Sequence, residues 1–150
     1  MLLLASGCAQ SADEIRGRAR VIDGDSIIVD RVEIRLWGVD APEYKQRCRR
    51  NHRNWECGKA ATKALRSRLS GRSLRCRRIS KDRHDRVVAR CKANNESINR
   101  WLVRNGWALD YRRFSKGAFA GEQSRAKAQR KGIWSAEFEA PEKYRRRNRR

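Results

Sequence analysis

Three short strand-like runs, separated only by turn-forming residues, constrain the fold of this chain most strongly. The runs are Arg18 to Asp23, Ser26 to Val29 and Val32 to Leu36. Asp30 and Arg31 turn the chain into the third run, in which apolar and polar residues alternate with period two. Arg35 is therefore expected on the strand face opposite Ile34 and Leu36. The sequence predicts a protein whose first part consists of closely connected β-strands.

Charged residues lie within and just beyond these runs. Asp25 follows the first run, Arg35 belongs to the third, and Asp40 and Glu43 come soon after it. Carboxylates at strand ends can hold a hard cation, an arginine can hold a phosphate, and a glutamate can accept a proton from water or orient it. Each residue alone would be an ordinary turn, loop or solvated side chain. Their combination in a basic chain indicates phosphodiester chemistry.

The charge balance favours a polyanionic partner. The chain has 38 Lys plus Arg against 17 Asp plus Glu, a net charge of +21 over 150 residues. Such a surface attracts nucleic acid and makes binding salt-dependent, although membrane surfaces and anionic polysaccharides would be attracted too. At 39% hydrophobic residues, the length fits one domain with one core. No apolar run approaches the length of a membrane span.

Beyond the first strands the sequence predicts a helix, two strands and two further helices. They cover Trp55 to Ser70, Ser73 to Ile79, Val87 to Lys92, Ser97 to Asn105, and Ala120 to Lys131 with Gly132 as its C-cap. In the first helix Ala61, Leu65 and Leu69 recur every four residues. Five short strands with about three α-helices predict an α+β protein built on a five-stranded Greek-key barrel of the OB type. Such barrels commonly present a strand face to oligonucleotides.

The cysteines indicate an oxidising compartment. The chain has five, and setting Cys8 aside leaves four, with no CxxC pair that would indicate zinc. Cys76 and Cys91 lie in two predicted strands joined by a charged turn, and Cys48 and Cys57 bracket a short polar loop. We expect disulfides Cys48–Cys57 and Cys76–Cys91. Four cysteines allow three connectivities, and four reduced thiols are the alternative.

The N-terminus resembles the end of a bacterial lipoprotein signal. Residues 1–8 are apolar and small, and the chain turns polar from Gln10 onward. Ala5 stands where such signals usually have Leu, and no basic n-region precedes it. Cys8 is the lipidation candidate and a possible membrane tether, and an ordinary N-terminus with a chance cysteine is the alternative. Together with the paired cysteines, this segment predicts an extracytoplasmic protein that is periplasmic, secreted or lipid-anchored.

The predicted organisation has three parts. Residues 1–15 form a signal-like or lipoprotein-like segment with its spacer, and residues 16–141 form the barrel domain. Residues 142–150 form a basic tail, expected to be disordered because it is rich in arginine. We expect a monomer without a protein partner.

Several short motifs occur together in a family-like order. They are Ile22 to Ser26, Ile34 to Leu36, Val39 to Glu43, Asp82 to Arg86, Leu102 to Ala108, and Gly132 to Trp134. With these motifs the chain resembles the staphylococcal-nuclease (thermonuclease) family from about residue 18 to residue 140. Trp55 to Gly58, together with Cys76 and Cys91, further resembles exported bacterial members that have extra cysteines.

The resemblance implies Ca²⁺-dependent hydrolysis of DNA and RNA, with cleavage of the 5′ P–O bond to leave 3′-phosphates. It also implies two sets of site residues: the carboxylates of Asp25 and Asp40 and the carbonyl of Ala41 as metal ligands, and Arg35, Glu43 and Arg86 as catalytic residues. A catalytically silent OB module that binds nucleic acid by charge is the alternative function. The presence of all these acids and arginines favours the enzyme.

The chain departs from the family pattern just before Arg86. His84 and Asp85 stand where the family usually has Tyr and Gly. His84 could replace the tyrosine as a phosphate donor, and Asp tolerates the positive φ that the glycine supplies. Tyr111 is a better candidate than Phe114 for stacking on a base. The implied substrate-binding residues are therefore His84 and Tyr111.

Overall fold

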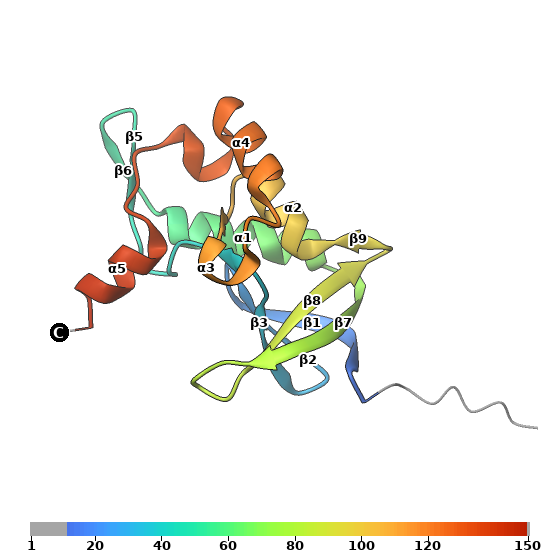
Figure 1. The fold of residues 1–150 in the computed structure, drawn as a ribbon. Helices are drawn as coiled ribbons and strands as arrows, with labels where there is room; N and C mark the ends of the chain where they lie inside the picture. Colours follow the sequence, from blue (N-terminus) through green and yellow to red (C-terminus); the bar gives the residue numbers. More distant parts are fainter. Residues whose placement is uncertain (1–11, 150) are drawn as a thin grey trace, which may run out of the picture.

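The structure is a computed structural model that describes residues 12–149, so the expectation for Cys8 lies outside the described residues. Five strands form a closed, mixed barrel, as Figure 1 shows at its lower side. They are β1 (Glu14–Asp23), β2 (Ser26–Val29), β3 (Val32–Leu36), β7 (Ser73–Lys81) and β8 (Val87–Ala93). β1 begins before residue 16, so the folded domain starts slightly earlier than predicted.

One parallel pairing closes the barrel. β3 pairs in parallel with β8, whereas β1–β2, β2–β3, β1–β7 and β7–β8 are antiparallel. Ile34 and Leu36 lie in the core beside Val87 and Ala89, and Arg35 lies on the opposite face of β3. The predicted α+β fold with an OB-type barrel is therefore confirmed.

The three predicted helices are present with somewhat different ends. They are α1 (Cys57–Leu69), α2 (Ile98–Arg104) and α4 (Ala120–Ala128). Gly132 is not the C-cap of the last helix, because α4 ends at Ala128 and Gly132 begins the 3-10 helix η1 (Gly132–Ser135). A Cβ at Gly132 would lie 2.3 Å from the carbonyl oxygen of Gly106. Gly132 thus allows close approach to the end of α2.

Several short elements were not predicted, because two to four residues are too few to show a periodicity. They are β4 (Val39–Asp40), β5 (Cys48–Arg50), β6 (Arg53–Trp55), β9 (Glu96–Ser97), β10 (Leu109–Asp110) and α3 (Arg112–Ser115). β4 pairs with β10, and β5 pairs with β6. These pairings attach the connecting segments to the barrel and to each other.

The expectation of a disordered tail is wrong for α5 (Pro141–Arg147), which is helical and lies to one side of the barrel in Figure 1. Pro141 occupies the first turn, where its missing N–H costs nothing. Acids elsewhere in the chain neutralise the arginines, since Arg145 pairs with Asp40 and Arg147 pairs with Glu139. The arginine-rich composition alone therefore overestimated the charge repulsion that would keep this segment from folding.

A second, smaller core supports the β5–β6 hairpin and the segment that leads to α5. Cys48, Cys57 and Ile133 form its buried centre, with Trp55, Leu109, Trp134, Ala136 and Phe138 packed around them. Arg49 and Glu137 exchange backbone hydrogen bonds of 2.9 and 2.8 Å. The C-terminal segment is thereby fastened to the hairpin.

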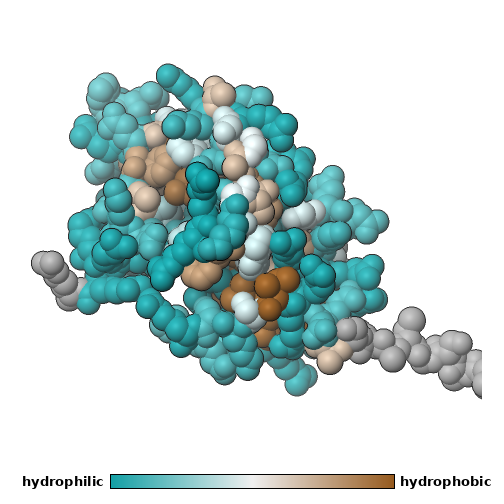
Figure 2. All heavy atoms as spheres, in the orientation of Figure 1, coloured by the Kyte–Doolittle hydropathy of each residue, from teal (hydrophilic) through white to brown (hydrophobic). Residues whose placement is uncertain are grey.

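Residues 12–149 contain two disulfides, Cys48–Cys57 and Cys76–Cys91, at the expected pairs. The second joins directly opposite residues of β7 and β8. Hydrophilic side chains cover most of the face shown in Figure 2. Within residues 12–149, none of the helices has the length and apolar character needed to cross a membrane.

Replacing Cys76 and Cys91 together by alanine should lower the free energy of unfolding by about 3 kcal/mol, because the bridge closes a loop of 15 residues. Urea denaturation of the double variant and the parent measures this difference. Adding dithiothreitol should cost the parent more stability than the variant, which has one bridge fewer to lose. Peptide mapping that found free thiols at these positions in the parent would contradict the pairing.

Candidate active site

A cleft of 510 Å³ opens beside the barrel and brings together most of the predicted site residues. Its walls come from the β1–β2 turn, from β3, from the turn between β7 and β8, from α3 and its approach, and from α5. Acids, arginines and aromatic rings line it, with charged side chains predominating. The mixture suits a polyanion that also carries flat rings.

Asp25 forms the buried centre of the site. It is 5% exposed, and its carboxylate lies 2.5 Å from Nη1 of Arg35 and accepts a 2.8 Å hydrogen bond from the N–H of Ala41. Its own carbonyl oxygen accepts a hydrogen bond from Leu36, which fixes the β1–β2 turn against β3. Burial opposes ionisation, but the charge and hydrogen bond of Arg35 and the Ala41 N–H outweigh it and hold the pKa of Asp25 below its usual value.

Asp40 lies beside Asp25 and shares its arginine. It is 2% exposed, and β4–β10 pairing opposite Leu109 fixes its backbone. Nη2 of Arg35 lies 3.4 Å from Asp40 Oδ1, so one guanidinium bridges both carboxylates. Burial raises the pKa of Asp40 to about 6, and the charge of Asp25 adds to this, although Arg145 opposes it.

Asp23, which was not assigned a role from the sequence, also faces the cleft. Its Oδ1 accepts a 3.1 Å hydrogen bond from the backbone N–H of Asp25. Burial and the neighbouring charge of Asp25 raise the pKa of Asp23 to about 7. The side chain therefore shapes the turn on which Asp25 lies.

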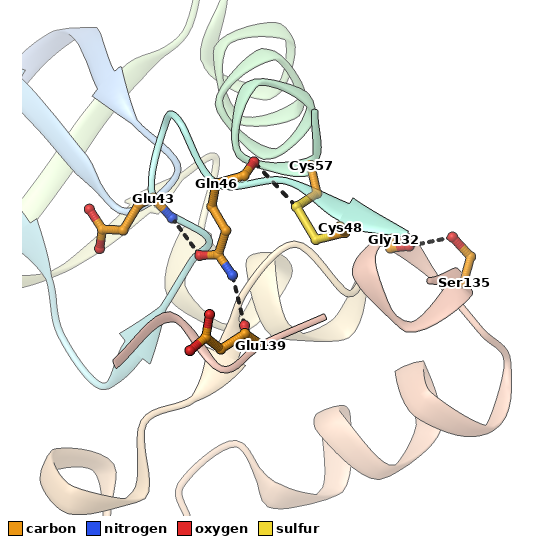
Figure 3. The surroundings of a disulfide bond; sticks show 7 residues. All are labelled: Glu43, Gln46, Cys48, Cys57, Gly132, Ser135 and Glu139. Carbon is orange, nitrogen blue, oxygen red and sulfur yellow. Dashed lines mark hydrogen bonds between the residues drawn. A yellow bond between two sulfur atoms is a disulfide. The ribbon is translucent and has the colours of Figure 1, made fainter. Parts of the chain in front are cut away.

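A buried glutamine holds the loop that contains Glu43. Gln46 Oε1 accepts a 3.1 Å hydrogen bond from the N–H of Glu43, and Gln46 Nε2 donates a 2.7 Å bond to the carbonyl of Glu139 (Figure 3). The N–H of Gly58 donates to the Gln46 carbonyl, and the Cys48–Cys57 disulfide lies against the same carbonyl. Glu43 therefore has a braced backbone while its carboxylate faces the cleft.

Arg86 and His84 lie on the β7–β8 turn and line the same cleft as Glu43. Asp82 organises the turn, because it accepts hydrogen bonds from the N–H groups of His84 and Arg86 and from Nε of Arg86 at 2.8 Å. Asp85 adopts φ +60, the left-handed conformation expected where the family has glycine. Its carboxylate pairs with Lys81, so Asp82 and not Asp85 holds Arg86.

Two aromatic rings complete the cleft. Tyr111 and Phe114 pack edge to face with their ring centroids 4.9 Å apart, and Phe114 is 54% exposed. Both rings face the cavity, so the geometry provides an apolar surface at its edge. The ring centroid of Tyr111, the predicted stacking residue, also lies 6.0 Å from the guanidinium carbon of Arg145.

Arg145 is a site residue that sequence reasoning missed. Its Nη1 lies 2.7 Å from Asp40 Oδ1 and 2.8 Å from Glu43 Oε1, and its Nη2 lies 3.2 Å from Asp40 Oδ2. It belongs to a run of similar arginines, so no local signal distinguished it. Asp82 begins the family-like run Asp82 to Arg86 but was assigned no role of its own, since one acid among several charged turn residues has no distinctive pattern.

The donor set fits a hard cation. Residues 12–149 contain no group of three or more His, Cys, Asp or Glu side chains arranged to hold a metal ion. Asp25 and Asp40 are nevertheless buried acids that share Arg35, and the Ala41 carbonyl would add a third oxygen. Oxygen donors suit Ca²⁺, which tolerates a shell completed by water. Both acids already attract guanidinium groups, so the position favours positive charge.

Comparison with known proteins identifies one family. The model of the family "Staphylococcal nuclease homologue" matches residues 33–136. The succinoglycan biosynthesis protein ExoI of Rhizobium meliloti (strain 1021) is 39% identical over 91% of this chain and 73% of its own length.

Two further relatives are named as nucleases. An uncharacterized endonuclease of Escherichia coli is 31% identical over 81% of this chain and 78% of its own length. The thermonuclease of Staphylococcus intermedius is 32% identical over 83% of this chain and 81% of its own length.

Gly58→Ala should lower the free energy of unfolding by about 1–3 kcal/mol, because a Cβ there would lie 1.8 Å from the carbonyl oxygen of Glu43. The backbone of the Glu43 loop would have to move. Gly121→Ala is the matched control, since nothing lies within 4 Å of its Cβ position and alanine favours the helix. Urea denaturation of both variants measures the difference. Equal free energies of unfolding for the two variants would show that the Glu43 loop does not pack closely against α1 at Gly58.

Proposed function

The chain belongs to the staphylococcal nuclease family, and from this membership we propose that it is a Ca²⁺-dependent phosphodiesterase that hydrolyses DNA and RNA. Its homology supports nuclease activity in general, and the family is metal-dependent. The observation that supports the proposal most strongly is the connected group of Asp25, Arg35 and Asp40, which Arg145 joins to Glu43. We propose Ca²⁺ as the metal ion and both DNA and RNA as the substrates.

Asp25, Asp40 and the Ala41 carbonyl are the proposed ligands. When bound, the ion would polarise a phosphoryl oxygen and neutralise charge that develops in the transition state. Asp25 is pre-oriented for this role, because Ala41 and Arg35 fix its two oxygen atoms. The low pKa of Asp25 keeps it ionised and available as a ligand.

In the proposed reaction water attacks the phosphorus atom, and the bond between phosphorus and the 5′-oxygen breaks. One product ends in a 3′-phosphate and the other in a 5′-hydroxyl, whose proton comes from solvent. Glu43 accepts the proton of the attacking water or orients that water. Arg35 and Arg86 offer planar, multi-donor contacts to the phosphoryl oxygens, which an ammonium group cannot match in geometry.

The cleft also supports the proposed substrate contacts. Tyr111 would stack on a base, and His84 would donate to a phosphate beside Arg86. Both side chains line the same cavity as Arg35 and Glu43. A net charge of +21 would draw a polyanion toward that cavity over long range.

We further propose an extracytoplasmic location and a monomer. The two disulfides are compatible with an oxidising compartment. Cys8 remains the candidate for lipidation and for a membrane tether, and the residues before β1 remain the proposed signal-like segment and spacer. A nuclease of low specificity outside the cytoplasm does not endanger the genome of its own cell.

Cleavage of single-stranded DNA by the purified protein should require added Ca²⁺ and stop in EGTA. Asp25→Ala should abolish the Ca²⁺-dependent rate, because it removes a proposed ligand and the partner of Arg35. Gel assays with circular dichroism of the variant separate loss of chemistry from loss of fold. Undiminished cleavage in chelator would overturn the metal assignment, and binding without cleavage in Ca²⁺ would favour the silent OB module.

Arg35→Ala, Glu43→Ala and Arg86→Ala should each lower the cleavage rate by about 10²–10³, because the arginines act on the reacting phosphate and Glu43 acts on the attacking water. Electrophoretic mobility shifts should show that DNA binding largely survives on the remaining basic surface. Arg66→Ala is the matched control, since this exposed arginine of α1 lies outside the cleft. If Arg86→Ala cleaves as fast as Arg66→Ala, the role of Arg86 is wrong.

A further inference from the structure

The helix α5 lies outside the residues that the family model matches, yet it contributes a side chain to the site. The match covers residues 33–136, whereas α5 spans Pro141–Arg147. Arg145 extends from this helix to Asp40 and Glu43. The contact therefore comes from a C-terminal segment that the family model does not cover.

Arg145 makes a fork-shaped contact with Asp40. Its two terminal nitrogens meet the two carboxylate oxygens of Asp40 at 2.7 and 3.2 Å. The Asp40 side chain is only 3% exposed and that of Arg145 is 23% exposed, so water screens this pair little. Charge-assisted, two-point contacts of this kind are among the stronger polar interactions in proteins.

The position of Arg145 Nη1 is the contact that bears most directly on metal binding. It lies 2.7 Å from Asp40 Oδ1 and 2.8 Å from Glu43 Oε1, so a positively charged group already sits between these two carboxylates. A divalent cation bound by Asp40 would need oxygen atoms that Arg145 now occupies. Two positive charges within a few ångströms of each other in a poorly solvated cleft repel strongly.

We propose that Arg145 and the divalent cation are alternative occupants of the Asp40 carboxylate, so that α5 is a tethered competitor which sets the Ca²⁺ concentration at which the site fills. This inference rests on the proposed function, because it takes Asp40 as a ligand. In the empty site Arg145 neutralises Asp40. Binding of the ion displaces the guanidinium toward the cleft, where the phosphates of a substrate could meet it.

The anchoring of α5 allows such an exchange without unfolding the domain. The segment before the helix is fixed by the Gln46 bond to Glu139 and by the backbone pairing of Arg49 with Glu137. Within α5 the other contacts are on exposed groups, such as Arg146 with Glu142 at 3.6 Å. Arg145 makes the closest contacts between this helix and the proposed ligands, so its release would break these contacts while Pro141 stays buried at the start of the helix.

The test compares Arg145→Gln with Arg146→Gln, which removes the same charge from the same helix without touching Asp40. Calorimetric titration with CaCl₂ should show about tenfold tighter Ca²⁺ binding by the Arg145→Gln variant than by the parent. The Arg146→Gln variant should stay within about twofold of the parent, because its long-range effect is screened by salt.

Thermal unfolding gives a second readout that needs no activity. In EGTA the Arg145→Gln variant should unfold at a lower temperature than the Arg146→Gln variant, because Asp40 loses its partner. Saturating Ca²⁺ should remove that difference, since the ion stabilises the folded state that binds it.

Three outcomes would overturn the inference. Equal Ca²⁺ affinities for both variants would show that Arg145 does not compete, while the proposed nuclease function would stand. Weaker Ca²⁺ binding by the Arg145→Gln variant would make Arg145 a support of the site. Failure of the parent and both variants to bind Ca²⁺ would reject both the competition and the proposed metal site.

Discussion

Two buried carboxylates that share one arginine, Asp25 and Asp40, create a demand for positive charge on which the rest of the site depends. Neither acid can stay ionised among barrel strands without a compensating cation. Arg35 reaches both acids from β3, and Arg145 reaches Asp40 from α5. The two acids respond differently. Burial and the charge of Asp25 raise the pKa of Asp40 to about 6, although Arg145 opposes this. Burial acts on Asp25 too, but Arg35 at 2.5 Å and the N–H of Ala41 outweigh it and hold the pKa of Asp25 below its usual value.

The buried side chain of Gln46 connects the loop that contains Glu43 to the segment that leads into α5. Gln46 is fully buried and binds the backbone of both Glu43 and Glu139 (Figure 3). The Cys48–Cys57 disulfide and the second core keep this glutamine in place from the other side. A conformational change in the segment that leads into α5 would thus be transmitted to the backbone of Glu43 through the side chain of Gln46. The disulfide is consequently part of the support of the site as well as of the stability of the fold.

The sequence predicted the barrel well because its strands and main helices repeat a pattern over several residues. Alternation in Val32 to Leu36 placed Arg35 opposite the core, and the family motifs indicated Asp25, Asp40 and Glu43. Short pairings such as β4–β10 could not be predicted, because they depend on partners distant in sequence. Arg145 could not be predicted either. It gains its role from a contact with a residue 105 positions earlier, and nothing in the neighbouring arginines distinguishes it.

The acids of this chain are few, and several of them hold an arginine at the cleft. Asp25 holds Arg35, Asp82 holds Arg86 through Nε, and Asp40 holds Arg145. A guanidinium bound through one edge keeps other N–H groups free for a second anion, so such pairing orients the arginine without using all its donors. Asp85 does not weaken this arrangement, because its carboxylate turns to Lys81. The replacement of Tyr-Gly by His84-Asp85 therefore keeps the left-handed backbone at residue 85 and leaves Arg86 oriented by Asp82.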